Sequence, residues 1–171
     1  MIVLVTGQVG LEKSKYLAQV KKLVIQKNIK CELITVGEKL IEIYPGKINE
    51  KSILNLPLTE LTILRRATWK EILQLSEWYH NKEDSILLIN SHAVFRWHHG
   101  LFPAIDLILV EQIKPDIIVT MIDDIDKIKK GLQKRGTDFF QLWELMAWRE
   151  EEIWFTKFLT ESINSLSTSS K

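Results

Sequence analysis

A segment that could bind phosphate follows the first apolar run of the chain. The residues Gly7-Gln8-Val9-Gly10-Leu11-Glu12-Lys13-Ser14 come after the apolar run of residues 2–6 and before a helical pattern. In a phosphate-binding loop, the backbone N–H groups and the positive end of the following helix point at a polyphosphate, a Lys reaches the outer phosphates and a Ser or Thr can bind Mg²⁺. The sequence therefore predicts a nucleoside triphosphate bound by residues 7–14, with Ser14 as a magnesium ligand.

One position of this loop departs from the motif. Where G-x-x-x-x-G-K-[ST] has its second Gly, the chain has Glu12. A carboxylate about 4 Å from a phosphate charge would cost on the order of 4 kcal/mol at an effective dielectric of 20, and its Cβ crowds the backbone. Two solutions stay open: Glu12 points outward to solvent or to Lys15, or the loop no longer holds a triphosphate. The plain alternative is a strand, a turn and a helix with a chance Lys-Ser.

A second polar segment follows another apolar run. Residues 90–96 read Asn-Ser-His-Ala-Val-Phe-Arg and come after residues 85–89. In open α/β sheets, ligands bind outside the carboxyl ends of the strands, so this segment should lie beside the loop. His92 is a candidate nucleotide contact, with a structural hydrogen-bonded His as the alternative. Arg65 and Arg66 could contact phosphate, although one of two consecutive helix arginines normally faces solvent.

The elements that must position these residues alternate between strands and helices. Short apolar runs predict strands, and apolar residues at helical spacing predict the helices. The expected strands are 2–6, 31–36, 85–89 and 116–122, and the expected helices are 13–28, 60–80, 103–112, 124–134 and 138–166. This order predicts an α/β fold with three layers, in which helices cover both faces of a parallel sheet. We expect one domain over residues 1–164 and a disordered tail over 165–171.

Composition narrows the class of protein. The chain has 171 residues and a formal net charge of +1. It lacks the basic stripe typical of nucleic-acid binders, so we expect no nucleic-acid partner. A lone Cys31 fits a reducing compartment. The sequence contains no apolar run long enough for a membrane span and no signal peptide, so we expect a soluble cytoplasmic protein without a membrane partner.

Several of these segments together resemble the archaeal adenylate kinases, over about residues 1–150. The resemblance rests on Lys-Ser at the end of the loop, Val36-Gly37-Glu38, Leu56-Pro57, residues 90–96, Gly100-Leu101-Phe102-Pro103 and residues 113–119. It implies a P-loop kinase fold and transfer of a phosphoryl group from MgATP to AMP. Such a reaction relies on positioning, Mg²⁺ and arginine charge.

The resemblance also implies roles for individual residues. Gly7, Gly10, Lys13 and Ser14 would form the triphosphate loop. Gly37, Glu38 and His92 would face the nucleotide substrate. Arg96 would hold the phosphate of the acceptor, and Arg135 and Arg149 would approach the transferred group, so that the implied catalytic residues are Lys13, Arg96, Arg135 and Arg149.

The departures from the family define an alternative function. Glu12 replaces a Gly, Asn90 replaces an Asp that helps to hold Mg²⁺ through water, and Leu54 stands where the family has an Arg. The arginine-rich lid is reduced to residues 134–138, and no apolar strand follows Ser162, so the last strand of the family is expected to be missing. Three functions stay open. The chain is a nucleoside monophosphate kinase or a related phosphotransferase or NTPase; or a catalytically impaired pseudokinase that serves as a nucleotide-binding or oligomeric interaction module; or an oligomeric scaffold that binds no nucleotide.

The final helix is rich in Trp and has too many large apolar residues for one stripe. It could form core, or an interface with aromatic anchors. A base-stacking platform would need basic residues, and the helix has Glu144, Glu150, Glu151 and Glu152 instead. We expect it to serve as core and as the contact with a homo-oligomer or another protein.

Overall fold

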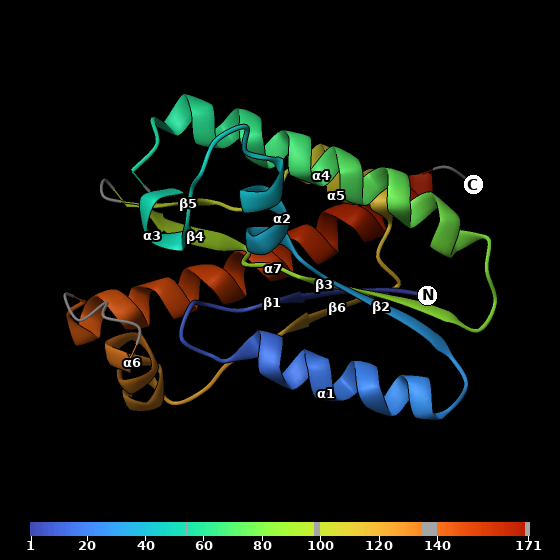
Figure 1. Ribbon diagram of the computed structural model, residues 1–171, viewed down its shortest axis with the longest axis horizontal. Helices are drawn as coiled ribbons and strands as arrows, with labels where there is room; N and C mark the ends of the chain where they lie inside the picture. The colour runs from blue at the N-terminus through green and yellow to red at the C-terminus, as the bar shows by residue number, and fades with distance from the viewer. Residues whose placement is uncertain (54, 98–99, 135–139, 170–171) are drawn as a thin grey trace.

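The main sheet is parallel and lies at the centre of the molecule. The computed structural model describes residues 1–53, 55–97, 100–134 and 140–169. Among these residues, four strands pair in the order β2-β3-β1-β6 (Figure 1). They are β1 (Ile2–Thr6), β2 (Lys30–Thr35), β3 (Ser85–Asn90) and β6 (Ile117–Thr120). The inner strands β1 and β3 are almost continuously buried, as expected for strands covered on both faces.

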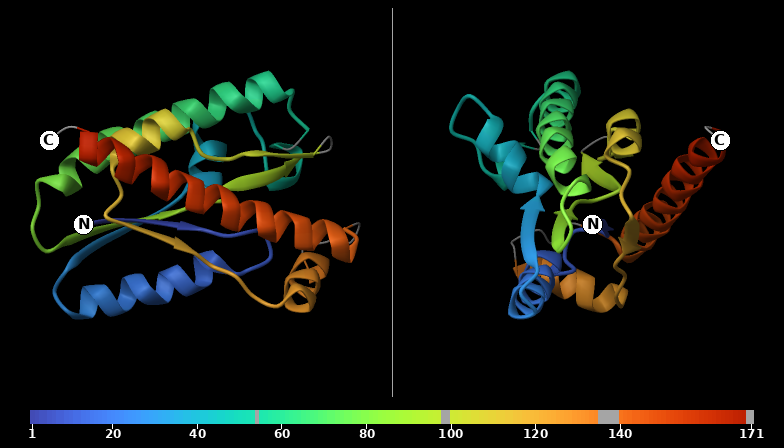
Figure 2. Two further views of the ribbon diagram at one scale, coloured as in Figure 1. Left: turned by 180° about the vertical axis from the view of Figure 1, so that it is seen from behind. Right: turned by 90° about the vertical axis from the view of Figure 1, so that its right-hand side faces the viewer.

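Helices cover both faces of this sheet, which confirms the three-layer α/β class. On one face, α1 (Lys13–Gln26) packs against β2 and β3. On the other face lie α4 (Leu58–His80), α5 (Leu107–Ile113) and α7 (Leu142–Ser169) (Figures 1 and 2). Trp69 and Tyr79 of α4 are fully buried between this layer and the sheet. None of the described helices combines the length and the apolarity that a membrane crossing requires.

Four short elements were not predicted. They are α2 (Val36–Ile43), α3 (Glu50–Ile53), β4 (Val94–Trp97) and β5 (Gly100–Pro103). β4 and β5 pair antiparallel, with Val94 opposite Pro103. The helix expected over 103–112 begins later, because Pro103 ends β5 and the side chain of Asp106 caps α5 by accepting a 3.2 Å hydrogen bond from the Leu109 N–H. Each has only four to eight residues, and none is a continuous apolar run like those of the predicted strands.

The C-terminal part contains α6 (Ile125–Lys134) and α7. The lid segment expected at 134–138 falls largely on residues 135–139, and Arg135 therefore lies outside the described residues, as does Leu54. Helix α7 continues to Ser169, past the expected boundary of the tail, because residues 165–169 contain no Gly or Pro to end it. One face of α7 is buried through Leu145, Trp148, Phe155 and Leu159, and the expected core role of this helix is confirmed.

Candidate phosphate-binding site

The loop of residues 7–12 connects the carboxyl end of β1 to the first turn of α1 (Figure 1). Its two glycines adopt positive φ angles, 138° at Gly7 and 101° at Gly10, which other residues rarely adopt. A Cβ at Gly7 would lie 2.6 Å from the Met121 carbonyl oxygen, and one at Gly131 of α6 would lie 2.7 Å from the Gly10 carbonyl oxygen. The loop is thus held between the end of β6 and α6.

Several side chains of the loop turn into the protein. Gln8 is buried, and its Nε2 donates a 3.3 Å hydrogen bond to the Leu145 carbonyl oxygen of α7. Val9 and Leu11 pack against the core. These contacts anchor the loop to the protein through its side chains.

The negative charge of Glu12 lies at the surface of the protein. It adopts the left-handed conformation, with φ 50° and ψ 30°, which is a position that favours Gly. Its side chain is 64% exposed, and its carboxylate lies 3.6 Å from the Nζ of Lys15. Of the two solutions considered for this residue, the structure therefore shows the first, in which the carboxylate points outward.

Lys13 is buried and turned onto its own loop. Its Nζ donates hydrogen bonds to the carbonyl oxygens of Gly7 and Gln8, the latter at 3.2 Å. The Nδ1 of His92 lies 3.1 Å from the same Nζ and 2.5 Å from the Gly7 carbonyl oxygen. The structure thus brings Lys13 and His92 together from segments far apart in the sequence, as expected for residues at neighbouring strand ends.

Ser14 and Asn90 also meet at this edge of the sheet. The Nδ2 of Asn90 donates a 3.0 Å hydrogen bond to Ser14 Oγ and lies 3.5 Å from Thr35 Oγ1. The Oδ1 of Asn90 is buried and has no hydrogen-bond partner among the described residues. A hydroxyl and an unpartnered amide oxygen fit a hard cation such as Mg²⁺, which usually takes the rest of its ligands from water and phosphate. No group of three or more His, Cys, Asp or Glu side chains in the described part of the chain could hold a metal by itself.

A buried carboxylate that the sequence analysis missed lies at the base of the loop. Glu152 of α7 is 1% exposed. Its Oε1 accepts 2.6 Å hydrogen bonds from the backbone N–H groups of Gly7 and Ala93, and its Oε2 accepts one of 3.0 Å from Val94. Burial raises the pKa of this carboxyl, and the three N–H donors and the charge of Lys13 act in the opposite direction. Glu152 therefore ties the final helix to both segments that form the site.

The helical spacing between Glu152 and two aromatic residues could have identified Glu152 as a buried residue. It follows Trp148 by four residues and precedes Phe155 by three, and both of these aromatic residues are buried. A carboxylate on the core side of an amphipathic helix needs donors, because a buried unpaired charge is costly. Because Glu152 is the last of three consecutive glutamates, its place on the buried side of the helix is not evident from the sequence.

The candidate arginines have carboxylate partners. Arg96 of β4 donates a 2.6 Å hydrogen bond to Glu144 of α7, and both side chains are largely buried. Arg149 pairs with its exposed neighbour Glu150 at 3.3 Å. In the structure, the charges of both candidate arginines are thus balanced by glutamates of α7.

Gly37 and Glu38 lie at the start of α2, directly after β2. Both are exposed, and a Cβ added at Gly37 would meet no heavy atom within 4 Å. Because β2 is parallel to β1 and β3, these residues share the carboxyl edge of the sheet with the loop. This location is compatible with contact to a second nucleotide.

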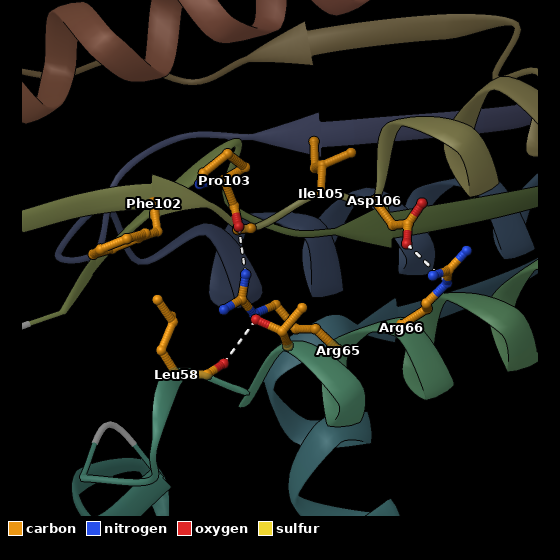
Figure 3. Close-up of a pocket in the computed structure, with 9 residues that line it drawn as sticks. Leu58, Arg65, Arg66, Phe102, Pro103, Ile105 and Asp106 are labelled. Atoms are coloured by element: carbon orange, nitrogen blue, oxygen red, sulfur yellow. Dashed lines mark hydrogen bonds and ion pairs between the residues drawn. The ribbon is translucent and has the colours of Figure 1, made fainter. Parts of the chain in front are cut away.

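Arg65 and Arg66 line a different cavity, a pocket of about 250 Å³ between α4 and the segment 102–106 (Figure 3). Arg65 donates a hydrogen bond to the Pro103 carbonyl oxygen and lies 3.9 Å from the centre of the Phe95 ring, while Arg66 lies 3.6 Å from Asp106. Burial lowers the pKa of Arg65 to about 10. Both arginines therefore have structural contacts, and the Nη2 of Arg65 is buried without a hydrogen-bond partner among the described residues.

Comparisons with known proteins agree with the resemblance seen in the sequence. No family model matches the chain. An adenylate kinase of Sulfurisphaera tokodaii is 27% identical over 137 residues, which cover 78% of this chain and 69% of that protein. The similarity is distant, but it extends over most of the chain.

Proposed function

We propose that this chain, a diverged adenylate kinase-like protein, binds ATP at residues 7–14 and transfers the terminal phosphoryl group to a nucleoside monophosphate. The observation that carries the proposal is the convergence of Lys13, Ser14 and Asn90 at one edge of a parallel sheet, at the amino end of α1. The positive end of a helix and the backbone N–H groups of a glycine loop favour a bound polyphosphate.

The position of Glu12 supports triphosphate binding. Its carboxylate is turned to Lys15 and to solvent, which reduces the repulsion of about 4 kcal/mol that a phosphate 4 Å away would cause. The loop also keeps the left-handed conformation at this residue without a Gly. The departure from the motif therefore does not direct a carboxylate at the proposed phosphate site.

Lys13 is the residue that we propose to move on binding. Its Nζ contacts carbonyl oxygens of the loop, and a phosphate oxygen would be a stronger acceptor because it carries charge. We propose that Lys13 exchanges the Gln8 carbonyl for the outer phosphates, while His92 keeps the Gly7 carbonyl.

We further propose that Mg²⁺ accompanies ATP. Ser14 Oγ would hold it, and Asn90, whose Nδ2 faces Ser14 in this structure, would have to turn its amide group to present Oδ1 to the same ion. When bound, Mg²⁺ would neutralise charge on the phosphates. Because both protein ligands are neutral, we expect the ion to bind with the nucleotide and not to the free protein.

The acceptor site is proposed at Gly37 and Glu38, with Arg96 as the ligand of the acceptor phosphate. A planar guanidinium offers paired donors to phosphate and keeps its charge. Arg96 would have to leave Glu144 for this role. Arg149 and Arg135 remain candidates for the transferred group, the first through release from Glu150.

Calorimetry with MgATP and a coupled phosphotransfer assay with each common nucleoside monophosphate test the proposal. We expect ATP binding and turnover with at least one acceptor, and loss of both in Lys13→Met. Lys22→Met is the matched control, because it removes the same charge from an exposed position of α1 away from the loop. Equal binding and turnover in the two variants would contradict the proposal.

A second candidate function is nucleotide binding without transfer. It is favoured by Asn90, which lacks the charge of a carboxylate beside Ser14, and by the Arg96–Glu144 pair. If this candidate is right, the native protein binds ATP but shows background turnover, and Asn90→Asp raises affinity for MgATP. An unchanged affinity in Asn90→Asp would count against it.

The proposal includes a cellular location and a contact with another protein chain. We propose a cytoplasmic location, where both nucleotides are available and where a free thiol such as the buried Cys31 stays reduced. We also propose that the outer face of α7 contacts protein, either a second subunit or another chain. The exposed Trp143 and Trp154 support this.

A further inference from the structure

The guanidinium of Arg65 on α4 is a largely buried charge without a carboxylate partner among the described residues. It donates a hydrogen bond to the Pro103 carbonyl oxygen, and its central carbon lies over the Phe95 ring, 3.9 Å from the ring centre. Its Nη2 is shielded from solvent and has no hydrogen-bond partner in the described part of the chain. Burial lowers the pKa of this side chain to about 10, without an opposing carboxylate among the described residues. Because buried charges in proteins are normally paired, Arg65 lacks the partner that its burial requires.

The pocket between α4 and the segment 102–106 lies beside this side chain (Figure 3). Arg65, Arg66 and Asp106 are its charged lining residues. Arg66 lies 3.6 Å from the Oδ2 of Asp106, whose Oδ1 accepts the hydrogen bond that caps α5. Arg66 and Asp106 thus balance each other, and among the described lining residues the charge of Arg65 stays unbalanced. The other walls are largely apolar and are formed by Leu58, Phe102, Pro103, Ala104 and Ile105.

Apolar walls around one unbalanced positive charge suit a ligand that is apolar over most of its surface and negative at one end. We infer that this pocket binds a small organic oxyanion, a carboxylate or a phosphate ester with an apolar body, whose oxygen atoms accept hydrogen bonds from Arg65. A planar guanidinium offers two parallel donors to such a group. Because Nη2 is shielded in the structure, binding includes a shift of the guanidinium toward the pocket that it lines.

The pocket is separate from the proposed nucleotide site. It contains no residue of the loop 7–14, and neither Gly37, Glu38 nor Arg96 lines it. Phe95 and Arg96 are consecutive residues of β4, so their side chains point to opposite faces of the hairpin. Phe95 packs against Arg65, whereas Arg96 pairs with Glu144 of α7. The inference is therefore independent of nucleotide binding.

Calorimetry of the full chain with three small probes tests the inference. The probes are benzoate, phenyl phosphate and benzamide, which is the neutral isostere of benzoate. We expect the better of the two anions to bind at least about tenfold more tightly than benzamide, because its hydrogen bonds to Arg65 are charge-assisted. A preference for benzoate identifies a carboxylate ligand, and a preference for phenyl phosphate identifies a phosphate ester. Failure of both anions to bind, or equal binding of benzamide, would overturn the inference.

Competition locates the bound anion. Saturating MgATP or AMP should leave the binding of the preferred anion unchanged, because the pocket shares no residue with the loop or with the proposed acceptor site. Displacement of the anion by either nucleotide would place it in the proposed nucleotide site and overturn the separate pocket.

Two variants test the residues of the pocket. Arg65→Met should weaken binding of the preferred anion by about tenfold or more, to the level of benzamide. Lys70→Met is the matched control, because it removes the same charge from an exposed position of α4 outside the pocket. Equal anion binding in these two variants would contradict the assigned role of Arg65.

A second substitution keeps the charge of Arg65 and fills the pocket instead. Thr62 is exposed and lines the pocket, so Thr62→Phe should also weaken binding by about tenfold or more. Thr59→Phe makes the same change at an exposed position of α4 outside the pocket and should leave anion binding intact. Urea denaturation of each variant shows whether it is folded. Unchanged anion binding in a folded Thr62→Phe would overturn the inference even where Arg65→Met fails to fold.

Discussion

The carboxylate of Glu152 accepts a 2.6 Å hydrogen bond from the backbone N–H of Gly7, which joins the final helix to the first residue of the loop. The same carboxylate accepts from Ala93 and Val94, which follow β3. A carboxylate can accept at both of its oxygens, whereas a neutral amide has one acceptor oxygen and an NH2 group that only donates. Glu152 therefore holds the two segments of the site in a fixed relation to each other.

Replacing this carboxylate should destabilise the protein. In Glu152→Gln, the amide group would turn its own N–H toward a backbone donor, and at least one N–H would lose its acceptor. We expect the free energy of unfolding to fall by about 3 kcal/mol, as for a buried charged group that loses its partners. Urea denaturation measures this. Glu151→Gln, on the exposed side of the same helix, should change it by less than about 0.5 kcal/mol.

The stability contributed by Glu152 should also depend on pH in a defined direction. Burial raises the pKa of this carboxyl in the folded protein, despite the N–H donors and the charge of Lys13. Between the unfolded and folded pKa values, the folded protein then binds more protons than the unfolded chain, so its stability falls as the pH rises through this window. The native protein should gain stability relative to Glu152→Gln when the pH is lowered toward the ordinary glutamate range. The opposite slope in denaturation at several pH values would contradict this.

Sequence patterns were sufficient for the larger elements of the fold. Apolar runs predict β1 and β3, and an apolar stripe predicts α4, to within a few residues. A strand buried on both faces is a continuous apolar run in the sequence, and a helix buried on one face has apolar residues at helical spacing. The sequence of the hairpin β4–β5 shows no such apolar pattern. Its strands contain few consecutive apolar residues, and Pro103, which is typical of the first turn of a helix, ends β5 instead.

The site was predictable where one motif determines it and not where packing does. Residues 7–14 were identified by their order between a strand and a helix, and the meeting of Ser14 with Asn90 follows from parallel strands that end at one edge. The outward turn of Glu12 depends on a backbone angle, and the roles of Glu152 and Glu144 depend on where α7 packs. No local pattern contains this information.

Two glycines in helices should respond to alanine in opposite directions. Alanine normally stabilises a helix interior by about 1 kcal/mol relative to Gly. At Gly37 a Cβ meets no atom, so Gly37→Ala should stabilise the protein by up to that amount. At Gly131 a Cβ would lie 2.7 Å from the Gly10 carbonyl oxygen, so Gly131→Ala should destabilise by about 1 to 3 kcal/mol and loosen the loop. Thermal denaturation of both variants measures the difference, and a gain in Gly131→Ala would show that α6 does not constrain the loop.

Replacing Glu12 by Gly should raise both the stability of the protein and its affinity for ATP. Glu12→Gly removes a left-handed non-glycine residue and should stabilise the protein by about 0.5 to 1 kcal/mol. It also removes a carboxylate next to the proposed phosphate site, so ATP affinity measured by calorimetry should rise. Lys114→Gly is the matched control, because Lys114 has φ 47° at the end of α5. That variant should gain similar stability with no change in ATP affinity.

We expect the Arg96–Glu144 pair to stabilise the folded protein and to weaken binding of the acceptor nucleotide. Its 2.6 Å hydrogen bond joins two largely buried side chains, so Glu144→Gln should lower the free energy of unfolding by about 1 to 2 kcal/mol. The same change frees the guanidinium, and if Arg96 is the ligand of the acceptor phosphate, the variant should bind nucleoside monophosphate more tightly than the native protein. Arg96→Lys keeps the charge but loses the paired donors, and it should weaken acceptor binding. Calorimetry on both variants decides the role of Arg96, since weaker acceptor binding in Glu144→Gln would assign this arginine to the packing of α7 against β4.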